Sequence, residues 1–288
     1  MADQAARLRE LVRRVKGDPV RRGEKKAHVF CITSGKGGVG KTSFTVNFAL
    51  ALSKCEKKVL IIDADFGFSN VNIMLGTNPK YNLGDVISGE RKLNEIMEEC
   101  HTNVWHISGG AGMMNLLNIN DDKLEYVMAQ LSTLDEVMDY ILIDTGAGFN
   151  NNILRLISAS DRTVLVMTSE PTSILDSYVV VKAMSVLEER PEIFALINKA
   201  DSEKNARQTY ENFTNVVKKH LGCNVEMLGF MPEDGRMTES ILSLVPYVVQ
   251  YPNRPLSARI QAIANEVTNS PAEAKPRGFR NFFSSLFD

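Results

Sequence analysis

Short runs of apolar residues recur along most of the chain, separated by longer segments with helical periodicity. Runs of this length, bounded by turn residues, are typical of strands buried on both faces of a parallel sheet. They predict seven strands, at residues 28–33, 58–63, 103–107, 139–144, 162–168, 192–197 and 225–230. Between several of them, apolar spacing predicts helices, for example at 42–54, 121–138, 172–189 and 203–221.

This alternation of strands and helices predicts the fold class. Repeated strand–helix units favour an α/β fold with a doubly wound, mostly parallel sheet and helices on both faces. The pattern occupies residues 27–267, which we interpret as one domain. Residues 268–278 form a polar Pro/Gly linker, and residues 279–288 return to an apolar, helical pattern.

Residues 1–26 differ from the rest of the chain. They hold nine basic and four acidic residues, so the segment carries a charge of +5. Leu8, Leu11, Val12 and Val15 fall at helical spacing, which predicts a short amphipathic helix followed by a basic linker. The segment has no apolar signal core, so we predict no secretion.

The last ten residues can form a second amphipathic helix. Such a pattern behind a polar linker is typical of a helix that lies on a membrane surface. The alternative is a helix packed on its own domain, and both states can hold in turn. The apolar side chains on one helical face are Phe279, Phe282, Phe283, Leu286 and Phe287.

Composition narrows the function classes. The chain has 288 residues, of which 44% are hydrophobic, and a formal net charge of −2, so no overall field favours nucleic acid. Its four cysteines, Cys31, Cys55, Cys100 and Cys223, form no CxxC and predict reduced thiols. No stretch reaches the length of a membrane span.

The strongest motif is Gly35-Lys36-Gly37-Gly38-Val39-Gly40-Lys41-Thr42, which matches G-x-x-x-x-G-K-[ST] between a strand and a helix. Its backbone N–H groups and the helix N-terminus favour bound phosphate. Lys41 can reach the β- and γ-phosphates, and the Thr42 hydroxyl can bind Mg²⁺. The glycines also fit G-x-G-x-x-G, but the Gly-Lys-Thr ending favours a triphosphate over a dinucleotide. The residues expected to contact the nucleotide here are Gly35, Lys36, Gly37, Gly38, Val39, Gly40, Lys41, Thr42 and Ser43.

Carboxylates follow two predicted strands directly. Asp63 and Asp65 end the strand at 58–63, and Asp144 ends the strand at 139–144. Parallel sheets place ligands at these carboxyl ends. Asp144 fits the Walker B position that holds the magnesium shell, and Gly146 and Gly148 allow the backbone close to a γ-phosphate. Asp63 could instead cap a turn or helix.

Lys36 makes the loop a deviant Walker A motif, and the loop therefore resembles the MinD/ParA/nitrogenase-iron-protein class of P-loop NTPases. The resemblance implies ATP with Mg²⁺, ATP-dependent homodimers, and a Lys36 that reaches the partner's nucleotide and joins Lys41 in catalysis. Residues 65–72 resemble the MinD switch I segment. Asp65 would then orient the attacking water and Asp63 would support magnesium. Asn72 stands where the class often has aspartate. The switch residues expected on this basis are Asp65, Gly67, Asn70, Gly146 and Gly148.

The segment Asn198-Lys199-Ala200-Asp201 leaves the base open to two interpretations. In small GTPases an NKxD string selects guanine. Resemblance to the MinD class instead implies adenine, with Asn198 at the base and the 230–234 loop, including Pro232 and Glu233, closing over it. The deviant P-loop favours adenine.

Both ends resemble those of the FlhG family (also called FleN or YlxH), MinD-like regulators of flagellar number and placement. Its DQAxxLR segment, represented here by Asp3, Gln4, Ala5, Leu8 and Arg9, activates FlhF, a GTPase of the signal-recognition-particle type. Gln4 would help position water in that partner. The tail resembles the membrane-targeting helix of MinD. The resemblance implies a cytoplasmic protein that binds the inner face of the cell membrane when it holds ATP, with other flagellar basal-body or regulatory proteins as further partners.

Three other functions are compatible with this class. A ParA-type ATPase that partitions DNA or cargo would need a basic dimer surface, and the net charge and the Phe-rich tail disfavour nucleic acid as a partner. An iron–sulfur carrier would need paired cysteines that the chain lacks. A regulator that binds a flagellar transcription factor is the third.

Overall fold

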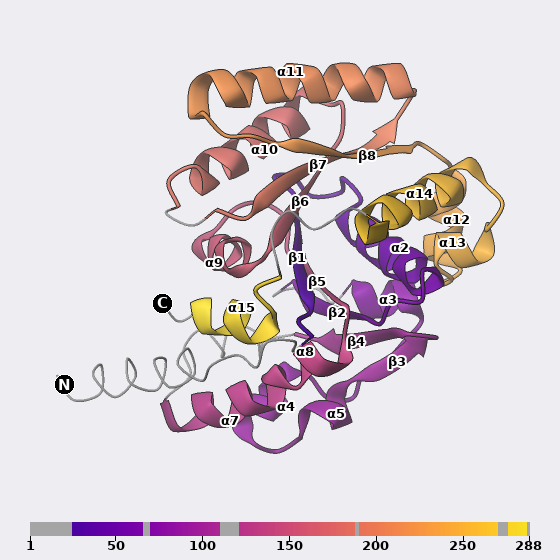
Figure 1. Ribbon diagram of the computed structural model, residues 1–288. Coiled ribbons are helices and arrows are strands. Elements are labelled where there is room, and N and C mark those ends of the chain that lie inside the picture. The colour runs from indigo at the N-terminus through magenta and orange to yellow at the C-terminus, as the bar shows by residue number, and fades with distance from the viewer. Residues whose placement is uncertain (1–24, 66–69, 110–120, 188–189, 270–275, 287–288) are drawn as a thin grey trace.

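The computed structural model describes residues 25–65, 70–109, 121–187, 190–269 and 276–286 (Figure 1). Eight strands form one sheet in the order β3-β4-β2-β5-β1-β6-β7-β8. Every neighbouring pair is parallel except β3 with β4. The strands are β1 (His28–Thr33), β2 (Val59–Ala64), β3 (Glu98–His101), β4 (Val104–Ser108), β5 (Tyr140–Thr145), β6 (Arg162–Met167), β7 (Glu192–Ala200) and β8 (Glu226–Pro232).

Helices cover both faces of this sheet, as Figure 1 shows. The described helices are α2 (Lys41–Lys54), α3 (Val71–Leu75), α4 (Leu83–Ser88), α5 (Leu93–Ile96), α7 (Asp121–Ser132), α8 (Leu134–Val137), α9 (Asn151–Ala159), α10 (Pro171–Met184), α11 (Glu203–Leu221), α12 (Arg236–Leu242), α13 (Tyr247–Gln250), α14 (Pro255–Asn269) and α15 (Phe279–Ser285). The predicted doubly wound α/β fold is confirmed.

Alternating strand residues divide the core into two clusters. In β1, Val29 and Cys31 face the helices α7, α9, α10 and α15, whereas Phe30 and Ile32 face α2 and α14. All four side chains are at most 1% exposed. This two-sided burial is the reason the strands read as continuous apolar runs.

The seven predicted strands are confirmed within two residues at most ends, apart from β7, which runs three residues further to Ala200. The sequence pattern missed β3, a short antiparallel edge strand of sequence Glu-Glu-Cys-His. Its charged residues give no apolar run, and charge is common on edge strands because it discourages further pairing.

Local side-chain hydrogen bonds decide where the helices end. Helix α11 has the predicted bounds because Ser202 caps its first turn and Gly222, with φ of 63°, ends it. The predicted helix at 121–138 is wrong as one unit. It breaks after Ser132, where the Thr133 hydroxyl donates to the Gln130 carbonyl at 2.7 Å, and α8 follows. Helix α10 ends at Met184, five residues before the predicted end at 189.

The C-terminal tail packs against the domain. Helix α15 contacts α7, α8, α9 and β1, and we call this contact area the tail-docking surface. The boundary predicted at 267 is also too early, because α14 continues to Asn269. Through these contacts, α15 belongs to the core cluster on one face of the sheet.

Candidate functional site

The glycine-rich loop connects β1 to α2 and takes a shape that side chains would obstruct. Gly38 and Gly40 have φ of 76° and 92°, a region that glycine enters at low cost. A Cβ on Gly35 would overlap the backbone of Asp176 in α10, and a Cβ on Gly40 would overlap the Asn198 amide. The loop is thus held closely between two neighbouring segments.

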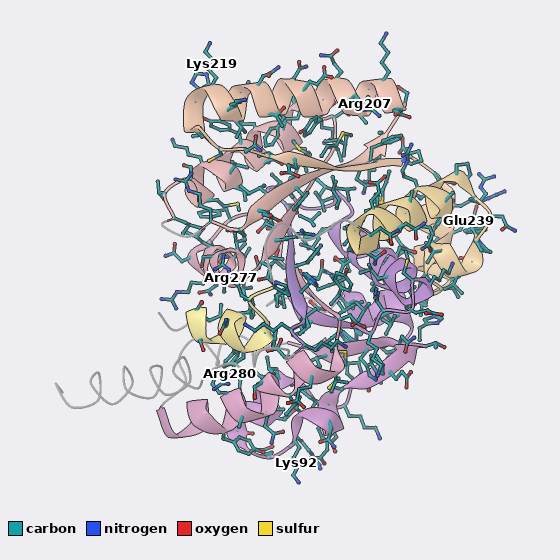
Figure 2. The ribbon with its side chains drawn as sticks, viewed as in Figure 1. Lys92, Arg207, Lys219, Glu239, Arg277 and Arg280 are labelled. Atoms are coloured by element: carbon teal, nitrogen blue, oxygen red, sulfur yellow. The ribbon has the colours of Figure 1, made fainter. Side chains whose placement is uncertain are left out.

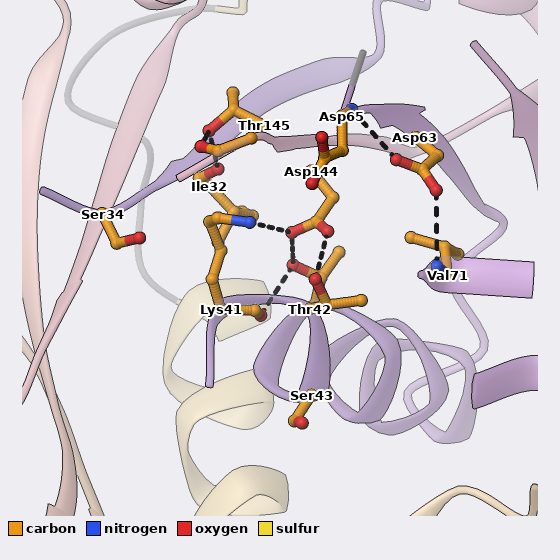
Figure 3. A network of polar contacts seen from close by, with 12 residues as sticks. Ile32, Ser34, Lys41, Thr42, Ser43, Asp63, Asp65, Val71, Asp144 and Thr145 are labelled. Carbon is orange, nitrogen blue, oxygen red and sulfur yellow. Dashed lines mark hydrogen bonds and ion pairs between the residues drawn. The ribbon is translucent and has the colours of Figure 1, made fainter. Parts of the chain in front are cut away.

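Asp144, at the end of β5, organises the start of α2 (Figure 3). One carboxylate oxygen accepts the Thr42 hydroxyl at 2.7 Å, and the other accepts the Thr45 hydroxyl at 2.8 Å. The Lys41 ammonium lies 3.7 Å from the latter oxygen, and both side chains are almost fully buried. Burial raises the pKa of Asp144, whereas Lys41 and the threonine hydrogen bonds lower it. Thr45 was not predicted, although its spacing four residues after Lys41 places it on the same helical face.

Asp63 and Asp65 lie beside Asp144, because the β2–β5 register pairs Asp63 with Asp144. Asp63 is 1% exposed, and its carboxylate accepts the backbone N–H groups of Asp65 at 3.0 Å and Val71 at 3.3 Å. Asp63 therefore caps the turn into α3, and the magnesium role that the resemblance implies for it stays a prediction. Asp65 lines the cavity, and a Cβ on Gly146 would lie 3.4 Å from its carboxylate oxygen. The two expected switch segments thus approach each other.

Lys36 points to the start of α10. Its ammonium lies 2.7 Å from the Glu170 carboxylate and 3.0 Å from the Thr172 hydroxyl. The hydrogen bond and charge of Lys36 lower the pKa of Glu170. Neither partner was predicted as a site residue. The signal available in the sequence was a proline, Pro171, that opens a helix after the three residues that follow β6.

A cavity of 520 Å³ extends from the P-loop past Asp65 and Asn70 to the loop after β8. Asn198, Pro232 and Glu233 line it, as expected for the base, whereas Asp201 is exposed and does not line it. The Asn198 amide donates to the Val39 carbonyl at 2.7 Å. The string Asn198–Asp201 therefore contacts the P-loop without placing its aspartate in the cavity.

The residues present fit ATP with magnesium. Gly38 and Gly40 take positive φ in the loop that lines the cavity, Lys41 and Thr42 line it as well, and the Thr42 hydroxyl is bonded to the buried Asp144 carboxylate. Within the described ranges, no three His, Cys, Asp or Glu side chains are grouped to hold a metal by themselves. Magnesium that keeps phosphate and water ligands needs only one or two protein groups, which these residues can supply.

The tail helix forms the second candidate site, and here its apolar face is buried. Phe279, Phe282, Phe283 and Leu286 are each at most 3% exposed. The Asp135 carboxylate accepts the N–H groups of Phe279 at 2.7 Å and Arg280 at 3.0 Å, which satisfies two donors of the first helical turn. Arg280, in the first turn of α15, is half-buried (Figure 2).

Several predicted residues lie outside the described ranges. They are the arm residues Asp3, Gln4, Leu8 and Arg9, the switch residue Gly67 and the tail residue Phe287. Over the ranges that are described, every helix is too short or too polar to cross a bilayer.

Comparison with known proteins identifies the family. The sequence matches the CobQ/CobB/MinD/ParA nucleotide binding domain over residues 30–247. Antiactivator FleN of Pseudomonas aeruginosa is 29% identical, over 88% of this chain and 91% of FleN. The flagellum site-determining protein YlxH of Helicobacter pylori is 30% identical, over 99% of this chain and 98% of YlxH. The resemblance seen in the sequence is thus confirmed.

Solved structures agree. A chain of the MinC:MinD cell division protein complex of Aquifex aeolicus matches with a TM-score of 0.70 and 27% identity, covering 88% of this chain and all of that one. MinD of Pyrococcus horikoshii complexed with Mg-ADP matches with a TM-score of 0.66 and 23% identity, covering 84% and 96%. The second match shows likeness of fold.

Proposed function

This chain belongs to the CobQ/CobB/MinD/ParA family of nucleotide-binding proteins and is an ATPase, and from that premise we propose that it regulates the number and placement of flagella. The observation that carries the proposal is the full-length match to YlxH, a flagellum site-determining protein. The deviant P-loop and its carboxylates supply the ATPase chemistry.

Each residue of the nucleotide site has a defined role in this proposal. ATP supplies the γ-phosphoryl group, with magnesium neutralising its charge. Thr42 and Asp144 hold the magnesium shell, with Asp63 supporting it, and Lys41 places a buried positive charge next to the phosphates. Asp65, which lines the cavity, positions the attacking water.

Lys36 links hydrolysis to dimerisation. In the single chain its ammonium is bound by Glu170 and Thr172. Both contacts lie at the surface, where an ion pair contributes little free energy, so a partner's phosphates compete effectively. ATP-bound chains therefore form homodimers, and Lys36 of each chain reaches the partner's nucleotide.

Dimerisation in turn controls membrane residence. The docked tail represents the state off the membrane, because its apolar face is buried in the domain. A single short amphipathic helix binds a bilayer weakly, whereas two helices on one dimer bind far more strongly through effective concentration. The ATP-bound dimer therefore occupies the inner face of the cell membrane, and hydrolysis returns it to the cytoplasm.

The N-terminal arm acts on a partner. The segment containing Asp3, Gln4, Leu8 and Arg9 stimulates an FlhF-type GTPase, and other flagellar basal-body or regulatory proteins bind the same regulator. One relative favours a second function, because FleN is named an antiactivator. Binding of a flagellar transcription factor is accordingly the alternative.

ATP hydrolysis and liposome co-sedimentation, measured in the same tubes, test this proposal. The comparison uses the full chain, Asp65→Ala and a truncation after Arg277. We expect ATP, but not ADP, to bring the full chain and Asp65→Ala to liposomes, while Asp65→Ala fails to hydrolyse ATP and the truncation stays in solution. Liposome co-sedimentation that is the same with ATP and with ADP would refute the membrane switch but not the assignment as an ATPase.

A further inference from the structure

The regular pairing of β7 with β8 is interrupted at the carboxyl end of β7, next to the P-loop. The register between β7 and β8 shifts between Ile197 and Ala200, so Asn198 and Lys199 leave the regular ladder. Lys199 has φ of 52°, a left-handed conformation that lysine rarely adopts. Bulges of this kind re-aim side chains next to active sites.

The bulge aims two consecutive donors at two consecutive carbonyls. The Asn198 amide donates to the Val39 carbonyl at 2.7 Å, and the Lys199 ammonium donates to the Gly38 carbonyl at 2.8 Å. The Lys199 backbone N–H donates to the Asn198 side-chain oxygen at 2.8 Å, which fixes the orientation of the amide. These three hydrogen bonds connect the end of β7 to the P-loop, and we call them the clasp.

Because each peptide unit is planar and trans, fixing a P-loop carbonyl also fixes the direction of the N–H group that follows it. A carbonyl and the following N–H point in opposite directions across the peptide bond. Lys199 therefore directs the Val39 N–H away from itself by holding the Gly38 carbonyl, and Asn198 does the same for the Gly40 N–H. Position 40 must be glycine for the Asn198 amide to lie there, because a Cβ at that position would overlap the amide.

We propose that Lys199, together with Asn198, is a positioning residue that orients the P-loop N–H groups toward a bound nucleotide phosphate. The proposal deepens the proposed function and rests on the cavity being the nucleotide site. Lys199 acts through the loop and not on the reacting atoms. Its substitution should therefore weaken binding of ADP and ATP alike and leave the ratio of their affinities unchanged.

The test compares Lys199→Met, which keeps the stem and loses the donor, with Lys199→Arg, which keeps a donor. Lys204→Met, an exposed lysine on α11, is the matched control. We expect Lys199→Met to bind fluorescent ADP and ATP analogues roughly 10-fold more weakly, with Lys199→Arg recovering most of the loss and Lys204→Met matching wild type. Equal affinity in Lys199→Met, or an equal loss in Lys199→Arg, would overturn the proposal.

Two further measurements separate positioning from simple stability. Lys199→Gly relieves the left-handed conformation, so we expect thermal stability at least equal to that of Lys199→Met together with the same loss of affinity. In the nucleotide-free protein, hydrogen exchange at Val39 and Gly40 should be faster in Lys199→Met. Unchanged exchange there refutes the clasp, whereas failure of wild type to bind any nucleotide refutes the proposed function instead.

A second observation concerns the two ends of the described chain. The Asp135 oxygen that accepts Phe279 N–H also accepts the Ala27 N–H at 3.1 Å. On the neighbouring loop, Asp161 accepts the N–H groups of Val29 at 2.8 Å and Arg277 at 2.9 Å. Each carboxylate thus joins the segment before or within β1 to the tail.

From this arrangement we infer that Asp135 and Asp161 couple tail docking to anchorage of the N-terminal segment. Ala27 and Val29 are fully buried in the same apolar cluster as the tail phenylalanines. When the tail leaves, water reaches Asp135 and competes for its oxygens, so the Ala27 hydrogen bond weakens. Linkage is reciprocal, so a partner that pulls residues 25–27 away weakens tail docking equally.

Hydrogen exchange on the full chain tests the coupling. Phe283→Asp undocks the tail without changing Asp135 itself, and Val186→Asp, at a position 80% exposed, is its control. We expect the Ala27 amide to exchange at least roughly 10-fold faster in Phe283→Asp only, with β7 unchanged. Asp135→Ala, with Glu136→Ala as control, should accelerate exchange in both α15 and residues 25–28.

Because mutation and not ATP releases the tail, this result stands apart from the proposed switch. The coupling would be refuted if Phe283→Asp accelerated hydrogen exchange in α15 but left exchange of the Ala27 amide unchanged. It would also be refuted if Asp135→Ala accelerated exchange in only one of α15 and residues 25–28. Nucleotide that never releases the tail would refute the switch and leave the coupling intact.

Discussion

The nucleotide cavity and the tail-docking surface belong to one domain but are built by opposite chemistry. The P-loop end of the cavity is organised by polar groups that hold one another in place, such as the buried Asp144 with Thr42 and Lys41. The tail-docking surface is apolar, and the chain's own phenylalanines fill it. The cavity thus depends on the positions of a few charged groups, whereas the tail-docking surface depends on buried apolar area. Substitutions in the cavity should therefore change mainly nucleotide binding and hydrolysis, and substitutions in the tail should change mainly the free energy of unfolding.

The largest effect should come from removing a charged group at the nucleotide cavity. Lys41→Ala removes the buried ammonium beside the phosphates, and we expect ATP hydrolysis to fall on the order of 10³-fold. A steady-state phosphate assay measures it. Lys54→Ala, at the far end of the same helix, should hydrolyse ATP normally, and equal loss there would contradict a local role for Lys41.

The next effect concerns the apolar side. Phe282 is 1% exposed, and Phe282→Ala should lower the free energy of unfolding by about 3 kcal/mol without lowering nucleotide affinity. Urea denaturation measures the first and ADP titration the second. Leu175→Ala, at a position 63% exposed, should cost less than about 0.5 kcal/mol. A small effect at Phe282 would mean that the tail is not docked in solution.

His106 sharpens the contrast between satisfied and unsatisfied buried polar groups. It is fully buried on β4, neither ring nitrogen has a hydrogen-bond partner among the described residues, and burial lowers its pKa to about 4. The unfolded pKa is higher, so titration of this histidine does not affect stability above about pH 6.5 and destabilises the folded state increasingly as pH falls from 6.5 toward 4.

Between pH 7 and 4.5 the wild type should therefore lose about 2 kcal/mol more stability than His106→Leu. Urea denaturation of both proteins at the two pH values provides the measurement. The difference between the proteins removes the contribution of the carboxylates they share. Parallel losses in the two proteins would show that His106 titrates normally.

The smallest effect tests close packing at the cavity. Gly35→Ala places a methyl group against the Asp176 backbone, so the loop or α10 must shift, and we expect about 10-fold weaker ADP binding. Ser53→Ala, at the other end of α2 from the loop, is the control and should bind ADP as wild type does. Unchanged affinity in Gly35→Ala would show that α10 yields easily.

Much of this was accessible from the sequence because the decisive features are local. The P-loop string, the aspartates at the carboxyl ends of β2 and β5, and the apolar strand runs each depend on a few consecutive residues. Strand β3 and the break after Ser132 were missed, because an edge strand has no apolar signature and a hydroxyl bond to a carbonyl interrupts an otherwise regular pattern.

Sequence alone determined the class of fold, the phosphate-binding loop and the amphipathic character of the tail, since these follow from residue type and spacing. Only the tertiary structure decided that Lys36 is bound to Glu170, that Lys199 holds the loop, and that the tail fills the surface around Asp135. These contacts join residues more than 130 positions apart. No local pattern encodes which distant backbone group or apolar face will lie opposite a side chain, because packing of the whole domain sets that geometry.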